Sequence, residues 1–315
     1  MIRVLGVDGG QSGIRLRHSA GDRVVEVEGV SRLEGDVVAS VADAIARGWR
    51  QSAFEPVERV VLGLTTAPAE AEAADRLCRL VGDSTGAAEV WLADDAVTTH
   101  AGALSLGWGV SIAAGTGVAC LAVPQDGEPR VIGGHGFLLG DEGGAFWIGR
   151  RGLNEVLRTV DGREDAARLR MLAASAKRRY GPLADLHVRL HSLDRPVHAI
   201  AQFAPDVLDA AEAGDPAAVM IRHQAARELL LLASAGAGWA RGGEDSVPLA
   251  LGGRLLADGT PLRRMLDGLL ARPGLPVVAR TADAAGLDGA ILLGLGADPG
   301  HYRGLVHRWS KEPAG

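Results

Sequence analysis

Cysteine and long apolar runs are scarce in this sequence, and each absence narrows its possible functions. The two cysteines, Cys78 and Cys120, cannot build a disulfide framework, and neither belongs to a CxxC pair. They fit a reducing compartment, in which cysteine behaves as a small hydrophobic residue. The longest apolar run, 229–240, is too short to cross about 30 Å of hydrocarbon, and the N-terminus shows no secretory signal. These features predict a soluble cytoplasmic protein.

Positive charge is also in deficit. Lys and Arg number 33 against 39 Asp and Glu, which gives a net charge of -6, and no long basic run suggests a nucleic-acid surface. Hydrophobic residues make up 47% of the chain, enough for a folded core. A length of 315 residues predicts about two domains. We therefore expect a folded protein that binds neither nucleic acid nor membrane.

The order of the predicted elements favours an internal duplication of an α/β domain. Hydrophobic periodicity predicts strands at 2–7, 14–17, 24–27, 57–64 and 90–93, and helices at 36–49 and 69–81. From residue 109 a similar order begins again, with strands at 110–114, 118–123, 129–132, 247–251 and 277–279, mostly helical sequence to about 240, and helices at 261–270 and from about 284. This repetition predicts two mixed α/β domains, residues 1–108 and 109–315.

A glycine-rich turn follows the first strand of each half. In Asp8–Ser12 and Gly115–Gly117 the missing side chains let backbone N–H groups approach phosphate oxygens, and each turn adds a hydroxyl, Ser12 or Thr116. Asp8 adds a carboxylate that suits Mg²⁺ held through water. Each turn alone is equally compatible with an ordinary hairpin, but their repetition favours phosphate binding. The sequence contains no GxxxxGK[ST], and no GxGxxG links a strand to a helix in a βαβ unit, which argues against P-loop and Rossmann enzymes.

Paired acids occur at two further places. Asp94 and Asp95 follow the strand 90–93, and open α/β sheets present ligand-binding groups at such strand ends. Asp95 is a candidate general base for a substrate hydroxyl that attacks a γ-phosphoryl group, whereas one of the two acids can instead be a helix N-cap. Asp141 and Glu142 lie in a glycine-rich turn, and carboxylates accept hydrogen bonds from sugar hydroxyls. By itself this turn is more typical of a solvated loop.

Taken together, six segments resemble one known family. They are VLGVDGGQSG at 4–13, LADDA at 92–96, AAGTG at 113–117, GGHGFLLGDEGGAFWIG at 133–149, LGGRLLADG at 251–259 and GLDGA at 286–290. In their order and their residues, they resemble the motifs of the N-acetylglucosamine kinase and BadF/BadG/BcrA/BcrD-type ATPase family of the sugar kinase, Hsp70 and actin superfamily. GDEGG with FWIG is the most specific of these motifs, and the resemblance covers nearly the whole chain.

The resemblance implies two ribonuclease-H-like domains with mixed sheets, flanking helices and an interdomain cleft that holds ATP and Mg²⁺. A last helix at about 301–311 would pack back on the first domain. By position, Asp95 becomes the catalytic base and contacts the substrate, and Asp8 becomes the metal-associated carboxylate. The implied nucleotide-binding residues are Asp8, Gly9, Gly10, Gln11, Ser12, Gly115, Thr116, Gly117, Gly252 and Gly253. The implied sugar-binding residues are Asp95, Gly134, His135, Gly136 and Asp141.

The sequence departs from the family pattern in the sugar pocket. The segment 29–34 lacks the expected Asn, Val118 and Ala119 stand where polar residues are usual, and His135 replaces a Trp. A pocket that loses amide and hydroxyl partners should discriminate sugars differently, because recognition of hydroxyls depends on paired buried groups.

Three functions remain open on the sequence alone. The first is an ATP-dependent kinase of an amino sugar, with N-acetylglucosamine as the first candidate and a homodimer as the expected assembly. The second is an ATPase coupled to a protein partner, whose relatives share an iron–sulfur cluster across a dimer through paired cysteines; such a cluster needs four thiolates. The third is a nucleotide-dependent sensor with an altered sugar pocket.

Overall fold

Two units divide the chain in the computed structural model, which describes residues 2–10, 13–30, 35–65, 67–165, 169–243, 246–272 and 274–311. The first unit comprises Met1–Ser111, Leu121–Arg130 and Ala282–Gly315, and the second comprises Ile112–Cys120 and Val131–Thr281. This division differs from a single boundary at residue 108, because the chain returns twice to the first unit.

The first unit is built on a six-stranded mixed sheet in the order β11-β5-β4-β1-β2-β3. Its strands are β1 (Val4–Gly9), β2 (Gly13–His18), β3 (Val24–Glu28), β4 (Arg59–Leu64), β5 (Glu89–Ala93) and β11 (Val306–Ser310). The neighbours β1, β4 and β5 are parallel, whereas β2, β3 and β11 join antiparallel to their neighbours. All six residues of β4 are buried, as expected of a central strand covered on both faces.

Helices cover both faces of this sheet. On one face lie α1 (Val37–Ser52) and α2 (Ala71–Thr85), and on the other lie α3 (Asp95–Ala103) and α12 (Gly286–Leu295). Alternate residues of β1 point to opposite faces: Leu5 and Val7 enter the core under α1 and α2, whereas a Cβ added at Gly6 would lie 2.7 Å from Ile291 of α12. Asp8 therefore lies on the α12 face of the sheet.

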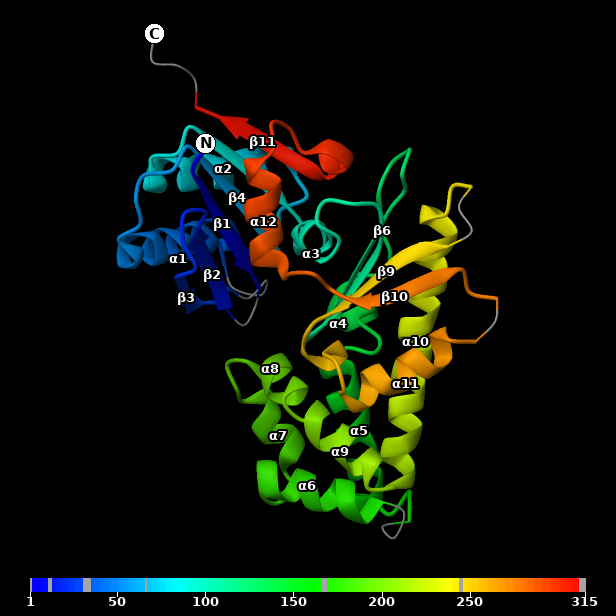
Figure 1. The fold of residues 1–315 in the computed structure, drawn as a ribbon. Helices are drawn as coiled ribbons and strands as arrows, with labels where there is room; N and C mark the ends of the chain where they lie inside the picture. The colour runs from blue at the N-terminus through cyan, green and yellow to red at the C-terminus, as the bar shows by residue number, and fades with distance from the viewer. Residues whose placement is uncertain are drawn as a thin grey trace. The chain divides into compact units, whose positions relative to one another are not determined.

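The C-terminal segment corrects one expectation. Instead of a helix at 301–311, the chain forms a 3₁₀ helix, η3 (Gly300–Leu305), and then β11, which pairs with β5 (Figure 1, red). Pairing with the open edge of β5 decides this conformation. The buried Tyr302 of η3 is hydrogen-bonded to His100 of α3 over 2.8 Å, and burial lowers the pKa of His100 to about 4. A neutral His100 therefore ties the C-terminal segment to α3.

The second sheet repeats the topology of the first. Its order is β10-β9-β6-β7-β8, the same sequence of strands as β5-β4-β1-β2-β3 in the first unit, which supports the predicted duplication. The strands are β6 (Gly109–Ala114), β7 (Val118–Val123), β8 (Arg130–Val131), β9 (Val247–Gly252) and β10 (Val277–Thr281). The division between the units passes through β6 and β7.

The second unit carries most of the helices. They are α4 (Gly136–Leu139), α5 (Ala145–Val160), α6 (Arg170–Tyr180), α7 (Leu186–His191), α8 (Pro196–Ala201), α9 (Ala204–Glu212), α10 (Pro216–Ala240) and α11 (Pro261–Leu270), with the 3₁₀ helix η2 (Arg254–Leu256). Asp215 caps α10 by accepting the N–H of Ala218, and Pro216 stands at its first position. No helix within the described ranges is long and apolar enough to span a membrane.

Candidate active site

Three parallel strands of the first sheet end in register, and the residues that follow them meet at one edge of the sheet. β4 lies between β1 and β5. Gly10 follows β1, Thr65 follows β4, and Asp94 and Asp95 follow β5. Because ligands of open α/β sheets bind beyond the carboxyl ends of the strands, this edge brings the candidate acids together in the first unit.

The structure separates the roles of the two adjacent acids. The Asp94 carboxylate accepts the N–H of Ala96 over 2.9 Å and caps α3. Asp95, the first residue of α3, instead accepts a hydrogen bond from the Thr65 hydroxyl, with 2.6 Å between Oγ1 and Oδ2. The alternative that one of the pair is a helix cap therefore holds for Asp94, and Asp95 is the acid at the strand edge with a side chain turned to Thr65.

The surroundings of Asp95 raise the pKa of its carboxyl group. Burial raises the pKa of its carboxyl group to about 7, and the charges of Asp94 and Asp8 add to the rise, while the hydrogen bond from Thr65 opposes it. A carboxylate with a pKa near the working pH suits a general base, since it can both take and release a proton. This side chain has the properties that proton transfer from a hydroxyl requires.

Asp8 lies opposite Arg15 in the β1–β2 ladder and forms an ion pair with it. On its other side the N-terminus of α12 approaches closely, since a Cβ added at Gly286 would lie 3.1 Å from Asp8 Oδ1. The charge of Asp8 reaches Asp95, so two carboxylates share this edge. Carboxylate oxygens with water are the donors that Mg²⁺ prefers, and Asp8 fits the predicted magnesium-associated residue.

The first glycine turn is described only in part. The Gly10 N–H donates to the Gly13 carbonyl over 3.0 Å, which closes the β1–β2 turn. The Gly9 carbonyl accepts the Thr65 N–H over 2.9 Å and so fixes the turn to the end of β4. Gln11 and Ser12 lie outside the described residues, and their predicted contacts with phosphate remain a prediction.

The second glycine turn is held by the helix that follows it in space. Within the turn the Gly115 N–H donates to the Gly117 carbonyl over 2.9 Å. The first two N–H groups of α5, from Ala145 and Phe146, donate to the carbonyls of Gly115 and Thr116 over 2.9 and 3.0 Å. Such N–H groups have no partner inside their helix, so α5 and the turn satisfy each other and form one rigid piece.

Asp141 is brought directly to this turn. It adopts a left-handed conformation, with φ of 59°, that few residues other than glycine take up. Its carboxylate lies against Gly117, where an added Cβ would collide with it, and accepts the Val118 N–H over 3.4 Å. Backbone strain of this kind is kept where the surroundings enforce it, often at functional sites. Asp141 therefore holds the Gly115–Gly117 turn as well as standing in the predicted sugar motif.

The other predicted sugar-site residues lie at the start of α4 and are exposed. Gly134 and Gly136 have φ of 70° and 74°, and the exposed His135 stands between them. These values explain the glycines, because a side chain at either position would be strained. Their role in sugar binding remains a prediction.

Gly252 and Gly253 meet the end of β6. With φ of 83°, Gly253 lies so close to Ala114 that an added Cβ would collide with the Ala114 carbonyl. Since Ala114 directly precedes Gly115, the structure brings the predicted adenine-binding turn next to the second phosphate turn.

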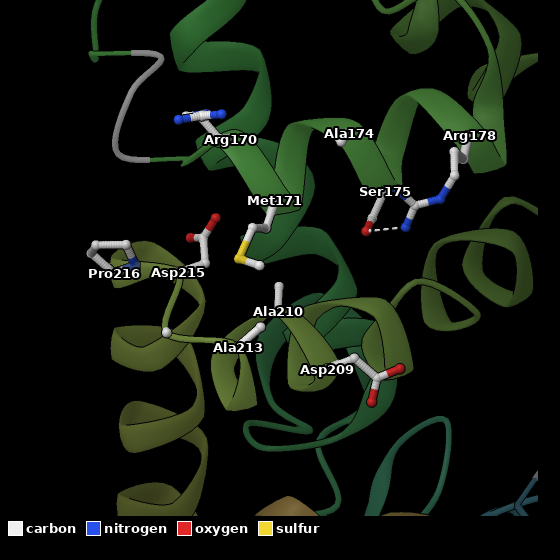
Figure 2. A pocket seen from close by; sticks show the side chains of 11 residues that line it. Arg170, Met171, Ala174, Ser175, Arg178, Asp209, Ala210, Ala213, Asp215 and Pro216 are labelled. Atoms are coloured by element: carbon white, nitrogen blue, oxygen red, sulfur yellow. Dashed lines mark hydrogen bonds between the residues drawn. The ribbon is translucent and has the colours of Figure 1, made fainter.

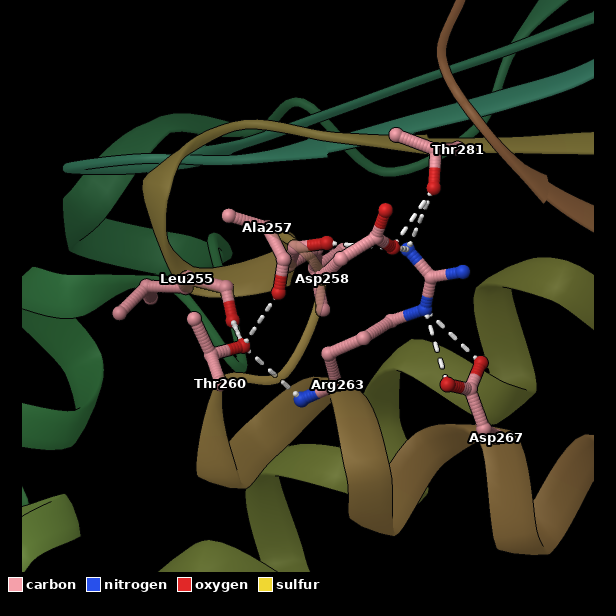
Figure 3. Close-up of polar contacts among 8 residues, drawn as sticks. Leu255, Ala257, Asp258, Thr260, Arg263, Asp267 and Thr281 are labelled. Atoms are coloured by element: carbon pink, nitrogen blue, oxygen red, sulfur yellow. Dashed lines mark hydrogen bonds and ion pairs between the residues drawn. The ribbon is translucent and has the colours of Figure 1, made fainter.

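A buried arginine holds the chain that leaves Gly253. The Gly253 carbonyl accepts the N–H of Leu256, and Arg263 donates from Nη1 to the Leu256 carbonyl over 3.1 Å. Figure 3 shows its guanidinium group between Asp258, Thr281 and Asp267; Nε lies 2.8 Å from Asp267 Oδ1. Arg263, on α11, thus links η2, β10 and its own helix behind the candidate nucleotide turn.

A separate pocket of about 660 Å³ lies among α6, α9 and the start of α10. Figure 2 shows Met171, Ala210 and Ala213 facing it, with Arg178 turned to Ser175, to which it donates a hydrogen bond over 2.7 Å. None of the motif residues is among those that line it. Among the described residues, no three His, Cys, Asp or Glu side chains form a group that could hold a metal ion.

A family model for the BadF/BadG/BcrA/BcrD ATPases matches residues 5–294. The chain belongs to this family. Glucosamine kinase GspK from Vibrio cholerae is 27% identical over 241 residues, which are 71% of this chain and 77% of that protein. The family expected from the motifs is thus confirmed, and this relative is a phosphotransferase with an alcohol acceptor, the expected class of enzyme.

Solved structures agree with this placement. A protein from Chromobacterium violaceum, described as a putative N-acetylglucosamine kinase, shares 27% identity and a TM-score of 0.69, covering 93% of this chain and 99% of its own. A ROK family glucokinase from Streptomyces griseus, solved with glucose and AMPPNP, has a TM-score of 0.54 at 19% identity, covering 91% of this chain and 97% of its own. The fold is that of the actin-like ATPases, with two mixed sheets flanked by helices.

Within this family, the cysteines of the present chain do not suit a shared cluster. Cys78 and Cys120 are both completely buried, and burial raises the pKa of each thiol to about 12. Cluster ligands are thiolates, so the structure gives no support to the iron–sulfur form of a partner-coupled ATPase.

Sequence reasoning missed Thr65, Arg15 and Arg263. The only local signal for Thr65 was a hydroxyl directly after a buried strand, and Arg15 alternates with apolar residues in an ordinary strand. Their roles depend on which strands are neighbours, which no local pattern reveals.

Proposed function

We propose that this chain is an ATP-dependent sugar kinase that transfers the γ-phosphoryl group of Mg-ATP to a hydroxyl of an amino sugar, with N-acetylglucosamine as the first candidate. The observation that carries the proposal is the Asp95 carboxyl group, with a pKa of about 7, at the end of β5 and in reach of the charge of Asp8. The curated relative that acts on glucosamine supports the amino-sugar class.

In the proposed reaction, Asp95 takes the proton of the sugar hydroxyl as its oxygen attacks the γ-phosphorus. A new P–O bond forms to the sugar, the bond to the β-phosphate oxygen breaks, and ADP leaves with the electron pair. Mg²⁺ supplies neutralisation of phosphate charge when bound, and Asp8 would hold it through water. Arg15 neutralises Asp8 when that ion is absent.

The turn at 115–117 and Gly252–Gly253 are proposed to bind the nucleotide. Both are places where the absence of a side chain leaves backbone open to a ligand, and α5, Asp141 and Arg263 hold them in place. We propose that Gly134, His135, Gly136 and Asp141 contact the sugar. The loss of amide and hydroxyl groups at 29–34, 118 and 119 should relax discrimination among hydroxyl patterns.

The test is ADP release with Mg-ATP across N-acetylglucosamine, glucosamine, neutral hexoses and anhydro-sugars, with a blank that lacks sugar. Sugar-dependent release that Asp95→Asn abolishes is expected. Equal release with and without sugar would contradict the kinase and support an ATPase coupled to a partner. ATP binding without release for any sugar would favour the sensor.

We also propose that the kinase is a homodimer, as the resemblance implies. The mass in solution, measured by light scattering, should be twice the 32.6 kDa of one chain; a mass of one chain would contradict it.

A further inference from the structure

Two neighbouring side chains act on the Asp95 carboxyl group in opposite directions. The Thr65 hydroxyl donates to Oδ2 over 2.6 Å, and a donor favours the ionised carboxylate. Asp94, the neighbouring N-cap, brings a negative charge close to Asp95, and this charge favours the protonated carboxyl group. Asp95 is therefore supported both before and after it gains a proton.

The position of Thr65 is fixed by backbone rather than by its side chain. Its N–H donates to the Gly9 carbonyl over 2.9 Å, and its hydroxyl lies 3.3 Å from the same carbonyl. A threonine hydroxyl has one proton and therefore donates to one acceptor at a time. The shorter distance to Asp95 and the charge of the carboxylate make Asp95 the favoured acceptor, with Gly9 as a second acceptor within reach.

We propose that Thr65 is a positioning residue that holds the Asp95 carboxyl group in one orientation through proton transfer by donating to its ionised form, with the charge of the neighbouring Asp94 acting in the opposite direction. This inference rests on the proposed function, in which Asp95 is the general base. Thr65 thereby keeps Oδ2 of Asp95 occupied.

The charges around Asp95 set the direction of every expected shift. Asp94 on α3 and Asp8 on β1 raise the pKa of Asp95. Arg15 on β2 is paired with Asp8. From α12, Asp288 is paired with Arg17. Removal of the Thr65 donor should therefore raise the pKa of Asp95, and removal of the Asp94 charge should lower it.

The experiment compares Thr65→Val, Thr65→Ser and Asp94→Asn by the pH dependence of kcat/KM. Thr65→Val should lower kcat/KM about tenfold at pH 6 and less than about threefold at pH 9, because the acidic limb moves up by about one pH unit. Thr65→Ser should restore the limb. Asp94→Asn keeps a good N-cap and should move the limb about one pH unit the other way. Thr85→Val is the matched control, since Thr85 is a buried hydroxyl of α2 that donates to the Val81 carbonyl.

A carboxyl-carbon NMR titration of Asp95 without substrate separates this inference from the kinase itself. A titration that moves up in Thr65→Val and down in Asp94→Asn supports the inference, even in a protein that releases no ADP with any sugar, where only the proposed function fails. Titrations and acidic limbs that match those of the unmodified kinase in both variants would overturn the inference and leave the kinase standing. Equal shifts in the same direction would also overturn it.

Discussion

The two sheets share one order of strands but hold very different turns at the same topological place. In the first unit the end of β1 carries Asp8, which pairs with Arg15 and whose charge acts on Asp95. In the second unit the turn after β6 is held by N–H groups of α5 and by Asp141. The sheet of the first unit thus brings ionisable groups together, whereas the turn in the second unit is held mainly by hydrogen bonds to backbone groups. Substitutions in the first unit should therefore change kcat and pH dependence, and those in the second should change nucleotide KM and stability.

The largest expected effect lies in the first unit. Asp95→Asn should lower kcat about 1,000-fold, because a general base contributes roughly 10²–10⁴-fold, while ATP binding by calorimetry stays within about threefold. Asp43→Asn, an exposed acid of α1, is the matched control and should leave kcat unchanged. Substantial kinase activity in Asp95→Asn would contradict the role of the first unit in proton transfer.

A substitution at Gly117 tests whether Asp141 holds the Gly115–Gly117 turn. Gly117→Ala places a Cβ against the Asp141 carboxylate and should lower the free energy of unfolding by about 1–3 kcal/mol, the usual cost of overpacking, and raise the KM for ATP about tenfold. In Gly115→Ala nothing lies within 4 Å of the new Cβ, so its melting temperature should change by much less. Equal melting temperatures for both variants would show that Asp141 does not hold the turn.

A buried arginine is the second brace of that unit. Arg263→Met leaves Asp258, Asp267 and the Leu256 carbonyl without this donor, and should cost about 2–4 kcal/mol of stability with a several-fold rise in nucleotide KM. Arg264→Met removes an exposed pair with Glu212 and should cost less than about 1 kcal/mol. Chemical denaturation of both variants, with ATP kinetics, measures the difference; equal losses would argue against the brace.

The smallest effect is a gain of stability in the first unit. The raised pKa of Asp95 means that, from about pH 4 to 7, the unfolded chain has lost a proton that the folded chain retains. The free energy of unfolding therefore falls as pH rises through this range. Asp95→Asn removes this decrease in the free energy of unfolding. The melting temperature of the variant should therefore exceed that of the unmodified protein, and by more at pH 8 than at pH 5. A constant difference between the two pH values would contradict the assigned shift.

Local sequence patterns predicted most of the strands and helices of the two units. Apolar alternation and turn residues placed β1, β2, β6 and β7 close to their observed bounds, because such short-range preferences also decide the structure there. The helix that the family resemblance implied at 301–311 does not form. The sequence VHRWS is a weak strand by itself, and it becomes β11 because the edge of β5, more than two hundred residues earlier, accepts it.

Candidate site residues that belong to a contiguous sequence motif could be predicted. Residues that only the fold brings to the site were missed. Asp8, Asp95 and Gly115–Gly117 stand within motifs that can be read along the chain. Either Asp94 or Asp95 satisfied the local rules for an N-cap, and only the contact from Thr65 separates them. That contact exists because β4 and β5 are neighbours, so it follows from topology rather than from any local spacing.

The pairing of β11 with β5 also has a consequence for biosynthesis. A chain made from its N-terminus presents β1 to β5 early, and residues up to 281 emerge from the ribosome before α12 and β11 exist. During that interval β1 lacks the helix that covers one of its faces, and β5 has an open edge, the kind of edge that invites pairing with other chains. The second unit can thus be complete while the first still awaits the last segment to be translated.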